Sequence, residues 1–384
     1  MDYDLMIVGG GLAGLALAVA LRRSRLKVAV VEARAPVTPA GWDARIYAVS
    51  PANARFLDEI GIWQHLDLSR CQPVAKMAVA GDRGGALEFS AYASGVGELA
   101  WIMESSLLQR ELWETAKRQG NVDLLCPGQP ALLDIGDGGA VLELADRRSL
   151  GAKLVVAADG ADSWTRSAAG IDVDFLPYDQ MGVVANFRTG QPHRGTAWQW
   201  FRSDGILAYL PLPGDLISIV WSTPTEHARE LLALDAAEFC ERVAAAGNYR
   251  LGGLELVTPP AGFPLRLMRA PRTVAPRLAL IGDAAHTIHP LSGHGINLGF
   301  QDAKSLAGVL AACPAHVDCG DLHWLRRHER ARREEVVALQ SVTHGLQRLF
   351  ATPQPPAVLL RNLGMNLFDR LPVIKDALAR YAMG

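Results

Sequence analysis

The chain has 384 residues, of which 49% are apolar and 20% are charged, and its formal net charge at pH 7 is −2. This length favours two or three domains around a large buried core, and the composition is typical of a folded protein. The near-neutral charge, without a run of Lys and Arg, disfavours nucleic acid as a partner. No window approaches the ~20 uninterrupted apolar residues of a membrane span, and the N-terminus lacks the positive region of a secretory signal. We expect a cytoplasmic protein.

The first part of the chain has the pattern of an α/β fold. Residues 5–8 and 27–31 are short apolar runs, and an Ala- and Leu-rich stretch up to residue 23 lies between them, which predicts strand, helix and strand. In the segments 52–66 and 105–118, apolar residues recur every three or four positions, as on amphipathic helices. The glycine-rich segments 81–85 and 136–139 separate alternating stretches, and no helix follows either of them, so we predict hairpin turns there.

The middle of the chain changes to short β-rich runs, punctuated by Gly, Pro or Asp, at 181–187, 196–201, 206–212 and 216–222. This pattern predicts an antiparallel sheet inserted into the α/β chain, on the substrate side. A helix is expected at about 225–246, then a buried strand at 278–281 and a long helical stretch. From about residue 346 onward, the pattern predicts an amphipathic tail, interrupted by prolines.

Three glycines and one acid make the clearest motif. Gly9, Gly11 and Gly14 lie between the first strand and helix, and Glu32 ends the next strand. One glycine allows a tight turn, one lets the backbone approach a pyrophosphate, and one permits close packing of helix on strand. The helix N-terminus then presents free N–H groups to the phosphates. Glu32 can accept hydrogen bonds from ribose hydroxyls and repels a 2′-phosphate, so the motif predicts dinucleotide binding without NADP at this site.

A second group of residues favours FAD over NAD. The strand at 278–281 leads into Gly282-Asp283, where an acid at a strand end could bind a ribityl hydroxyl. Glycines just beyond, in the segment 293–297, would let an extended flavin lie against bare backbone. Asp159-Gly160 follows another predicted strand.

Cysteine and histidine residues give a weaker signal. The five cysteines are widely spread and have no CxxC pair, which argues for reduced thiols. Cys313, His316, Cys319 and His323 are close in sequence, but their spacing matches no common zinc module. We therefore expect no metal site.

Taken in this order, the motifs resemble the three fingerprints of class A flavoprotein monooxygenases, the para-hydroxybenzoate hydroxylase-like fold. More narrowly, the chain resembles the FAD-dependent hydroxylases of ubiquinone biosynthesis nearly from end to end. The segments that carry this narrower likeness are Asp43-Ala44-Arg45, Ala48-Val49-Ser50, Ile60-Gly61-Ile62-Trp63, His289-Pro290-Leu291-Ser292-Gly293-His294-Gly295-Ile296-Asn297-Leu298-Gly299, and, in the tail, Phe350, Arg361, Asp369 and Met383-Gly384.

The resemblance implies a domain organisation. A discontinuous, Rossmann-type FAD-binding domain would comprise residues 1–72, 97–178 and 270–345. A substrate domain built on the inserted antiparallel sheet would comprise 73–96 and 179–269, and 346–384 would form a C-terminal helical segment.

The resemblance also implies roles for individual residues. Those that would contact FAD are Gly9, Gly11, Leu12, Ala13, Gly14 and Glu32 at the ADP half, Arg45 near the flavin and pyrophosphate, Asp283 at the ribityl chain or pyrophosphate, and Gly293, Gly295, Ile296 and Asn297 near the isoalloxazine ring. Asp159 could be structural or could touch a cofactor. Ser105 and His294 depart from the residues that many relatives carry at these positions.

No catalytic base is identified from the residues, but three candidates for the flavin face are Pro290, His289 and Trp200. Trp198 and Trp200 project to one face of a strand, which suits a substrate-cavity wall or simple core equally. For His286 we favour a structural role.

The activity implied by the resemblance is the hydroxylation of a polyprenylated phenol or quinol through a C4a-hydroperoxyflavin, with dioxygen as co-substrate. NAD(P)H or another electron donor would bind transiently. The resemblance leaves open peripheral contact with the inner membrane, through the amphipathic tail, or association with other ubiquinone-biosynthesis proteins. The alternatives are a prenyl-chain reductase and a non-catalytic flavoprotein subunit. A halogenase is disfavoured because the segment 205–211 lacks the two tryptophans of that family's strand.

Overall fold

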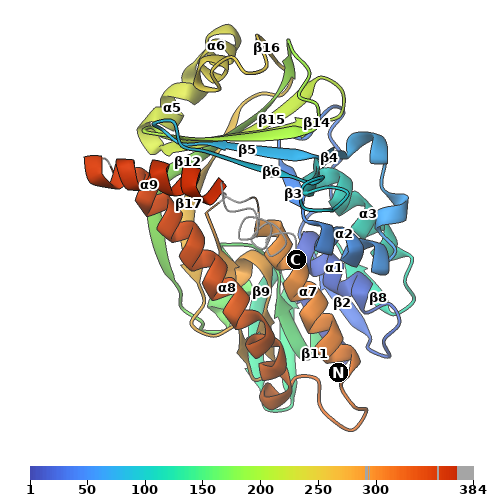
Figure 1. The fold of residues 1–384 in the computed structure, drawn as a ribbon. Helices are drawn as coiled ribbons and strands as arrows, with labels where there is room; N and C mark the ends of the chain where they lie inside the picture. Colours follow the sequence, from blue (N-terminus) through green and yellow to red (C-terminus); the bar gives the residue numbers. More distant parts are fainter. Residues whose placement is uncertain (290–292, 294, 353, 370–384) are drawn as a thin grey trace.

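The computed structural model describes residues 1–289, 293, 295–352 and 354–369 (Figure 1). In this part of the chain, eight strands form a first sheet with the order β18-β19-β11-β1-β2-β8, and β10 and β9 extend it from β11. The central pairs are parallel. The strands are β1 (Tyr3–Val8), β2 (Val28–Val31), β8 (Val122–Leu125), β9 (Pro130–Gly136), β10 (Gly139–Leu144), β11 (Ser149–Ala157), β18 (Val274–Ala275) and β19 (Leu278–Leu280).

Successive side chains of β1 point to opposite faces of the first sheet and take part in two hydrophobic cores, one on each face. Leu5 and Ile7 point to one face, where they pack with buried residues of three helices, α1, α3 and α7. Met6 and Val8 point to the other face, which is packed with residues of β9, β10 and α4. The helices of this half are α1 (Leu12–Ala20), α2 (Pro51–Glu59), α3 (Ser105–Lys117), α4 (Trp164–Ala168) and α7 (Gly295–Ala311). The predicted strand, helix and strand pattern at the start of the chain is confirmed.

A second, mainly antiparallel sheet has the order β20-β17-β12-β15-β14-β13-β5-β6, and β16 pairs with β12. It lies across the upper part of the molecule in Figure 1, with α5 and α6 on its outer face. Its strands are β5 (Lys76–Ala80), β6 (Ala86–Ser90), β12 (Asp174–Thr189), β13 (Thr196–Arg202), β14 (Gly205–Leu212), β15 (Leu216–Pro224), β16 (Leu254–Leu256), β17 (Ala261–Arg269) and β20 (His286–Thr287). All four β-rich runs predicted in the middle of the chain join this sheet. The exact domain boundaries stay a prediction.

A small third sheet connects the two halves. It consists of β3 (Ile46–Val49), β7 (Ala100–Glu104) and β4 (Gln72–Val74), with β7 in the centre. Val74 and Ile102 of this small sheet are buried in one cluster with Ala197, Leu212 and Leu216 of the second sheet. This apolar contact fixes the second sheet above the first.

One helix prediction is wrong in detail. The single helix expected at 225–246 is two helices, α5 (Thr225–Ala233) and α6 (Ala236–Ala246), because the Asp235 side chain caps α6 by accepting a hydrogen bond from the Glu238 amide. Further along the chain, α8 (Leu322–Ala351) contains residue 346 and is followed by α9 (Pro355–Asp369), and the segment boundary at 346 stays a prediction.

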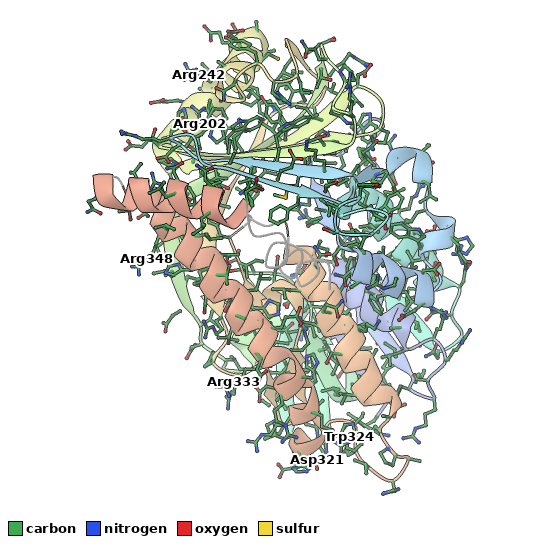
Figure 2. The ribbon with its side chains drawn as sticks, in the orientation of Figure 1. Arg202, Arg242, Asp321, Trp324, Arg333 and Arg348 are labelled. Carbon is green, nitrogen blue, oxygen red and sulfur yellow. The ribbon has the colours of Figure 1, made fainter. Side chains whose placement is uncertain are left out.

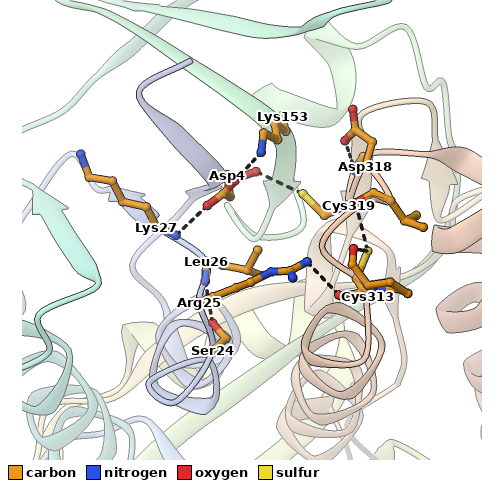
Figure 3. A network of polar contacts seen from close by, with 12 residues as sticks. Asp4, Ser24, Arg25, Leu26, Lys27, Lys153, Cys313, Asp318 and Cys319 are labelled. Carbon is orange, nitrogen blue, oxygen red and sulfur yellow. Dashed lines mark hydrogen bonds and ion pairs between the residues drawn. The ribbon is translucent and has the colours of Figure 1, made fainter.

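The loop between α7 and α8 contacts β1 and the turn before β2 through the two cysteines considered above for metal binding (Figure 3). The Cys319 thiol lies 3.5 Å from the Asp4 carbonyl, and the Arg25 guanidinium donates to the Cys313 carbonyl at 2.9 Å. The Asp4 carboxylate also binds the Lys153 ammonium, at 2.7 Å. Burial raises the pKa of the Cys319 thiol to about 12. These thiols therefore serve packing as weak donors and are not poised as thiolates.

Candidate functional site

A cleft of about 570 Å³ opens at the carboxyl ends of the parallel strands of the first sheet. This edge is where open α/β sheets bind their ligands. Of the residues that the sequence predicts for FAD binding, those lining the cleft are Gly9, Gly11, Leu12, Ala13, Glu32, Arg45, Asp159, Asp283, Gly295 and Ile296. They come from segments spread along the chain from Gly9 to Ile296, and the fold brings them together.

The glycine loop has the geometry that a bound pyrophosphate requires. Gly9 has φ of +111°, in the region that favours glycine, and Gly11 is the N-cap of α1. A Cβ at Gly14 would overlap the Gly9 carbonyl oxygen, so this glycine allows α1 to pack closely against the loop. The first N–H groups of a helix have no partner within it, and those of α1 open toward the cleft. Gly14 therefore shapes the cleft without lining its described wall.

Glu32 holds the loop while facing the cleft. One carboxylate oxygen accepts a hydrogen bond from the Gly10 amide at 2.6 Å, and the other accepts from the Arg34 amide at 2.9 Å. Each oxygen has a second lone pair, so the carboxylate keeps acceptor capacity toward the cleft.

Gln109 is a cleft residue that the sequence reasoning missed. It lies one turn after Ser105 on the same face of α3, and its side-chain amide donates to the Gly10 carbonyl at 2.9 Å. The sequence did contain a signal for Gln109: it lies four residues after Ser105, so both polar side chains lie on one face of an amphipathic helix. The other cleft residues that were missed include Tyr47, Gly128, Gln129, Pro130, Asp162 and Trp164.

Asp283 and Arg45 bring opposite charges to the cleft. Asp283 lines the cleft from a short 3-10 turn (Gly282–Ala284), and its side chain is exposed to the open space. Burial raises the pKa of its carboxyl, and the nearby charges of His286 and Arg45 oppose that shift. The Arg45 side chain is exposed, and its guanidinium makes no hydrogen bond or ion pair with the described residues. A free cation in a dinucleotide cleft is suited to an anionic ligand.

The Asp159 carboxylate is engaged by the protein itself. It accepts hydrogen bonds from the Thr165 amide and hydroxyl, both at 2.9 Å, and from the Ser163 hydroxyl at the start of α4. Buried Arg166 then donates to the Ala161 and Ala284 carbonyls, at 3.0 Å each, and so links this turn to the Gly282 turn. The geometry favours the structural alternative for Asp159.

The segment 293–297, which includes the first turn of α7, contains four predicted residues, and the structure separates them. Gly295 and Ile296 line the cleft, whereas the Asn297 amide is buried and bonded to Ser50, Asn53, Ala48 and Gly293. Asn297 therefore fixes β3 and α2 against α7. Gly293 has φ of +63° and does not belong to the described cleft wall. Pro290 and His294 lie outside the described residues.

Two flavin-face candidates do not reach the described cleft. Trp200 packs edge-on against Tyr209, at 4.8 Å between ring centroids, in the core beneath α5 and α6. The second sheet contacts the small third sheet through its opposite face. Trp198 and Trp200 are therefore core residues, and we do not retain Trp200 as a candidate for the flavin face. His289 is fully buried, 3.1 Å from the Gln180 side-chain oxygen, and burial lowers its pKa to about 4.

The cleft residues suit FAD. A helix N-terminus and a free arginine meet the needs of a diphosphate, a carboxylate at each end can accept from sugar hydroxyls, and bare backbone at Gly295 leaves room for a flat ring. These features and the fold define a flavoprotein that binds FAD at the edge of a Rossmann-type sheet.

Comparison with known proteins gives the same class. Residues 2–337 match the FAD binding domain family. The chain is 34% identical to the ubiquinone hydroxylase UbiL of Rhodospirillum rubrum, over 99% of this chain and 89% of the relative, and 33% identical to the 3-demethoxyubiquinol 3-hydroxylase of Escherichia coli, over 99% and 98%. The structure of p-nitrophenol 4-monooxygenase PnpA from Pseudomonas putida has a TM-score of 0.81 at 19% identity, over 99% and 98%, and so shares the fold. The chain belongs to the family of FAD-dependent ubiquinone-biosynthesis hydroxylases.

Proposed function

We propose that this enzyme hydroxylates the aromatic ring of a polyprenylated phenol or quinol intermediate of ubiquinone biosynthesis, with FAD and dioxygen. The observation that carries the proposal is a dinucleotide cleft of the FAD type in a chain whose full-length relatives are named as hydroxylases of ubiquinone and demethoxyubiquinol. The likeness extends through the second sheet, which is the part that faces the substrate in our interpretation.

We further assign a role to each part of the cleft. The α1 N-terminus, from Gly9 to Gly14, and Arg45 bind the diphosphate, and Glu32 binds the adenosine ribose. Asp283 binds the ribityl chain, and Gly295 and Ile296 lie against the ring. The positions of these residues around one cleft support the assignment.

Bound FAD supplies the activation of dioxygen, and the protein must orient the substrate ring and exclude water. Apolar side chains of the second sheet, Ala197, Leu212 and Leu216, face the small third sheet in a buried cluster that can exclude water near the cleft. The sequence has one glycine-rich dinucleotide fingerprint, and it belongs to FAD. We therefore propose that NAD(P)H or another donor binds only transiently.

Isotope labelling tests the activity. We expect aerobic turnover of a short-chain prenylphenol with FAD, a reductant and ¹⁸O₂ to give a product carrying one labelled oxygen atom by mass spectrometry. Turnover of alkenes without oxygen would favour a prenyl-chain reductase. Bound flavin that dioxygen reoxidises without hydroxylation of any phenol would favour a non-catalytic subunit, and either outcome would overturn the proposal.

We also propose that the enzyme rests on the membrane surface through its last two described helices. Val342, Leu346 and Leu349 on α8, and Leu363 and Leu367 on α9, are between 39% and 63% exposed and recur at helical spacing. Figure 2 shows Arg348 projecting outward from the same part of α8. An apolar stripe next to a cation suits an anionic bilayer, where the proposed substrate resides. None of the described helices is long and apolar enough to span a membrane.

A paired substitution tests this surface. We expect Leu363→Glu with Leu367→Glu to weaken cosedimentation with phosphatidylglycerol vesicles at least about fivefold, because two exposed apolar contacts are replaced by charges that anionic lipid repels. Leu132→Glu is the control, since Leu132 is 55% exposed on β9, in the other half of the molecule. A wild-type protein that does not sediment with vesicles, but does bind other ubiquinone-biosynthesis proteins, would replace the membrane with a protein partner.

A further inference from the structure

A buried carboxylate lies directly behind the turn that carries Asp283. Asp302, on α7, is 2% exposed, and one of its oxygens accepts a hydrogen bond from the Gly282 amide at 2.9 Å. The same oxygen is 2.7 Å from His286 Nε2, and the other oxygen accepts from Arg332 Nε at 2.8 Å. Asp302 therefore joins three segments at one point: the Gly282 turn, the strand that follows it, and α8.

The charges around this carboxylate keep it ionised. Burial alone would raise the pKa of Asp302, but His286 and Arg332 outweigh burial and hold the pKa well below its usual range. Burial alone would likewise lower the pKa of His286, and the Asp302 carboxylate reverses that shift. Arg332 also pairs with Glu335 on the solvent side of α8. The group is a buried ion-pair network in which both oxygens of the Asp302 carboxylate have donors, as a buried carboxylate requires.

The position of Asp302 on α7 ties two walls of the cleft together. The N-terminal turn of α7 supplies Gly295 and Ile296 to the cleft, and Asp302 lies two turns further along the same helix. At Gly299, between them, α7 lies beside the Gly282 turn, where an added Cβ would be in van der Waals contact with the Gly282 Cα at 3.6 Å. The hydrogen bond from Gly282 to Asp302 sets the distance and the angle between the turn and the helix.

We infer that Asp302 is a positioning residue for the flavin half of the cofactor. It acts through the Gly282 amide, which fixes the direction in which Asp283 enters the cleft relative to the start of α7. It does not touch the cleft itself, because it belongs to the buried core behind it. This inference rests on the proposed assignment of Asp283 to the flavin half and Glu32 to the ADP half.

The substitution Asp302→Asn tests the inference. Both carboxylate oxygens accept hydrogen bonds from donors, whereas an amide has one acceptor oxygen, so its NH₂ group must face a donor. We expect the FAD dissociation constant, measured by quenching of flavin fluorescence, to rise at least about tenfold, as for the loss of one hydrogen bond to a charged group. The dissociation constant for ADP, measured by calorimetry, should change less than about twofold, because ADP uses only the α1 and Glu32 part of the cleft. At saturating FAD, the visible circular dichroism of the flavin should also change.

Two matched variants complete the experiment. Glu335→Gln removes a partner of Arg332 without touching the turn, so it should bind FAD within about threefold of the wild type. If Asp302→Asn does not fold, His286→Gln takes its place, because it replaces the charged partner of the Asp302 carboxylate by a neutral one. A larger rise in the dissociation constant for FAD than for ADP would then support the inference, and an equal rise, or none, would overturn it. Wild-type FAD affinity in Asp302→Asn, or an equal loss of FAD and ADP, would also overturn it. Failure of the wild-type apoprotein to bind FAD would instead overturn the proposed function.

Discussion

We expect the Gly9→Ala variant to be purified without bound flavin. Gly9 has φ of +111°, a conformation that costs a residue with a side chain about 1–3 kcal/mol. An added Cβ would also overlap the Ala158 carbonyl oxygen and come within 2.8 Å of the Asp159 amide nitrogen. Both atoms belong to backbone at the end of the neighbouring strand, so β1 and β11 must separate where the cleft opens. Visible absorption per mole of protein measures the bound flavin.

Gly214→Ala is the control for this variant. Gly214 has φ of +73° in the hairpin between β14 and β15, and a Cβ there would meet no atom within 4 Å. The variant should therefore lose only about 1–2 kcal/mol of stability from the backbone conformation and keep its flavin. Wild-type flavin content and an unchanged unfolding temperature in Gly9→Ala would show that the loop does not need this glycine.

The glycine loop could be predicted from the sequence because its information is local. The two strands, the helix, the three glycines and Glu32 all lie within about thirty residues, and each residue type has a separate physical reason. The structure places this loop at the cleft as expected. A similar argument found Asp283, because an acid at the end of a buried strand must lie at the same edge of the sheet.

Other cleft residues depend on the order of the strands, which a single sequence does not reveal. Gly128, Gln129 and Pro130 line the cleft because β8 pairs with β2, so the loop after β8 ends at the same edge of the sheet as Glu32. Nothing in the local pattern of 128–130 distinguishes this loop from an ordinary turn. Asn297 was predicted from a local motif, but its side chain does not face the cleft. It forms hydrogen bonds with the backbone of Ser50 and Ala48, which are distant in the sequence.

Sheet faces are a second limit. Because side chains alternate along a strand, the sequence correctly placed Trp198 and Trp200 on the same face. The alternation does not reveal which element covers that face. The structure covers it with α5 and α6, so these side chains are buried beneath the helices. The break between those helices had a readable signal, because Asp235 followed by Glu238 three residues later has the pattern of a helix N-terminus.

Removal of the Arg45 guanidinium should weaken FAD binding strongly without destabilising the apoprotein. The side chain is exposed in the cleft, and its guanidinium makes no hydrogen bond or ion pair with the described residues, so Arg45→Ala removes no such contact from that part of the protein. Its proposed partner is the FAD diphosphate, and a charge-assisted hydrogen bond of about 1.5–3 kcal/mol corresponds to roughly a 10- to 100-fold rise in Kd. Titration of the apoprotein with FAD, followed by fluorescence, measures this change.

The salt dependence of the same titration separates an electrostatic contact from a steric one. Wild-type affinity for FAD should fall as NaCl is raised, because salt screens the attraction between Arg45 and the diphosphate, and Arg45→Ala should show a smaller fall. Arg34→Ala is the matched control, since Arg34 is an exposed arginine at the end of β2 that contacts Glu32 only through its backbone amide. An Arg45→Ala protein with wild-type Kd but a lower unfolding temperature would mean that Arg45 supports the fold and does not hold the cofactor.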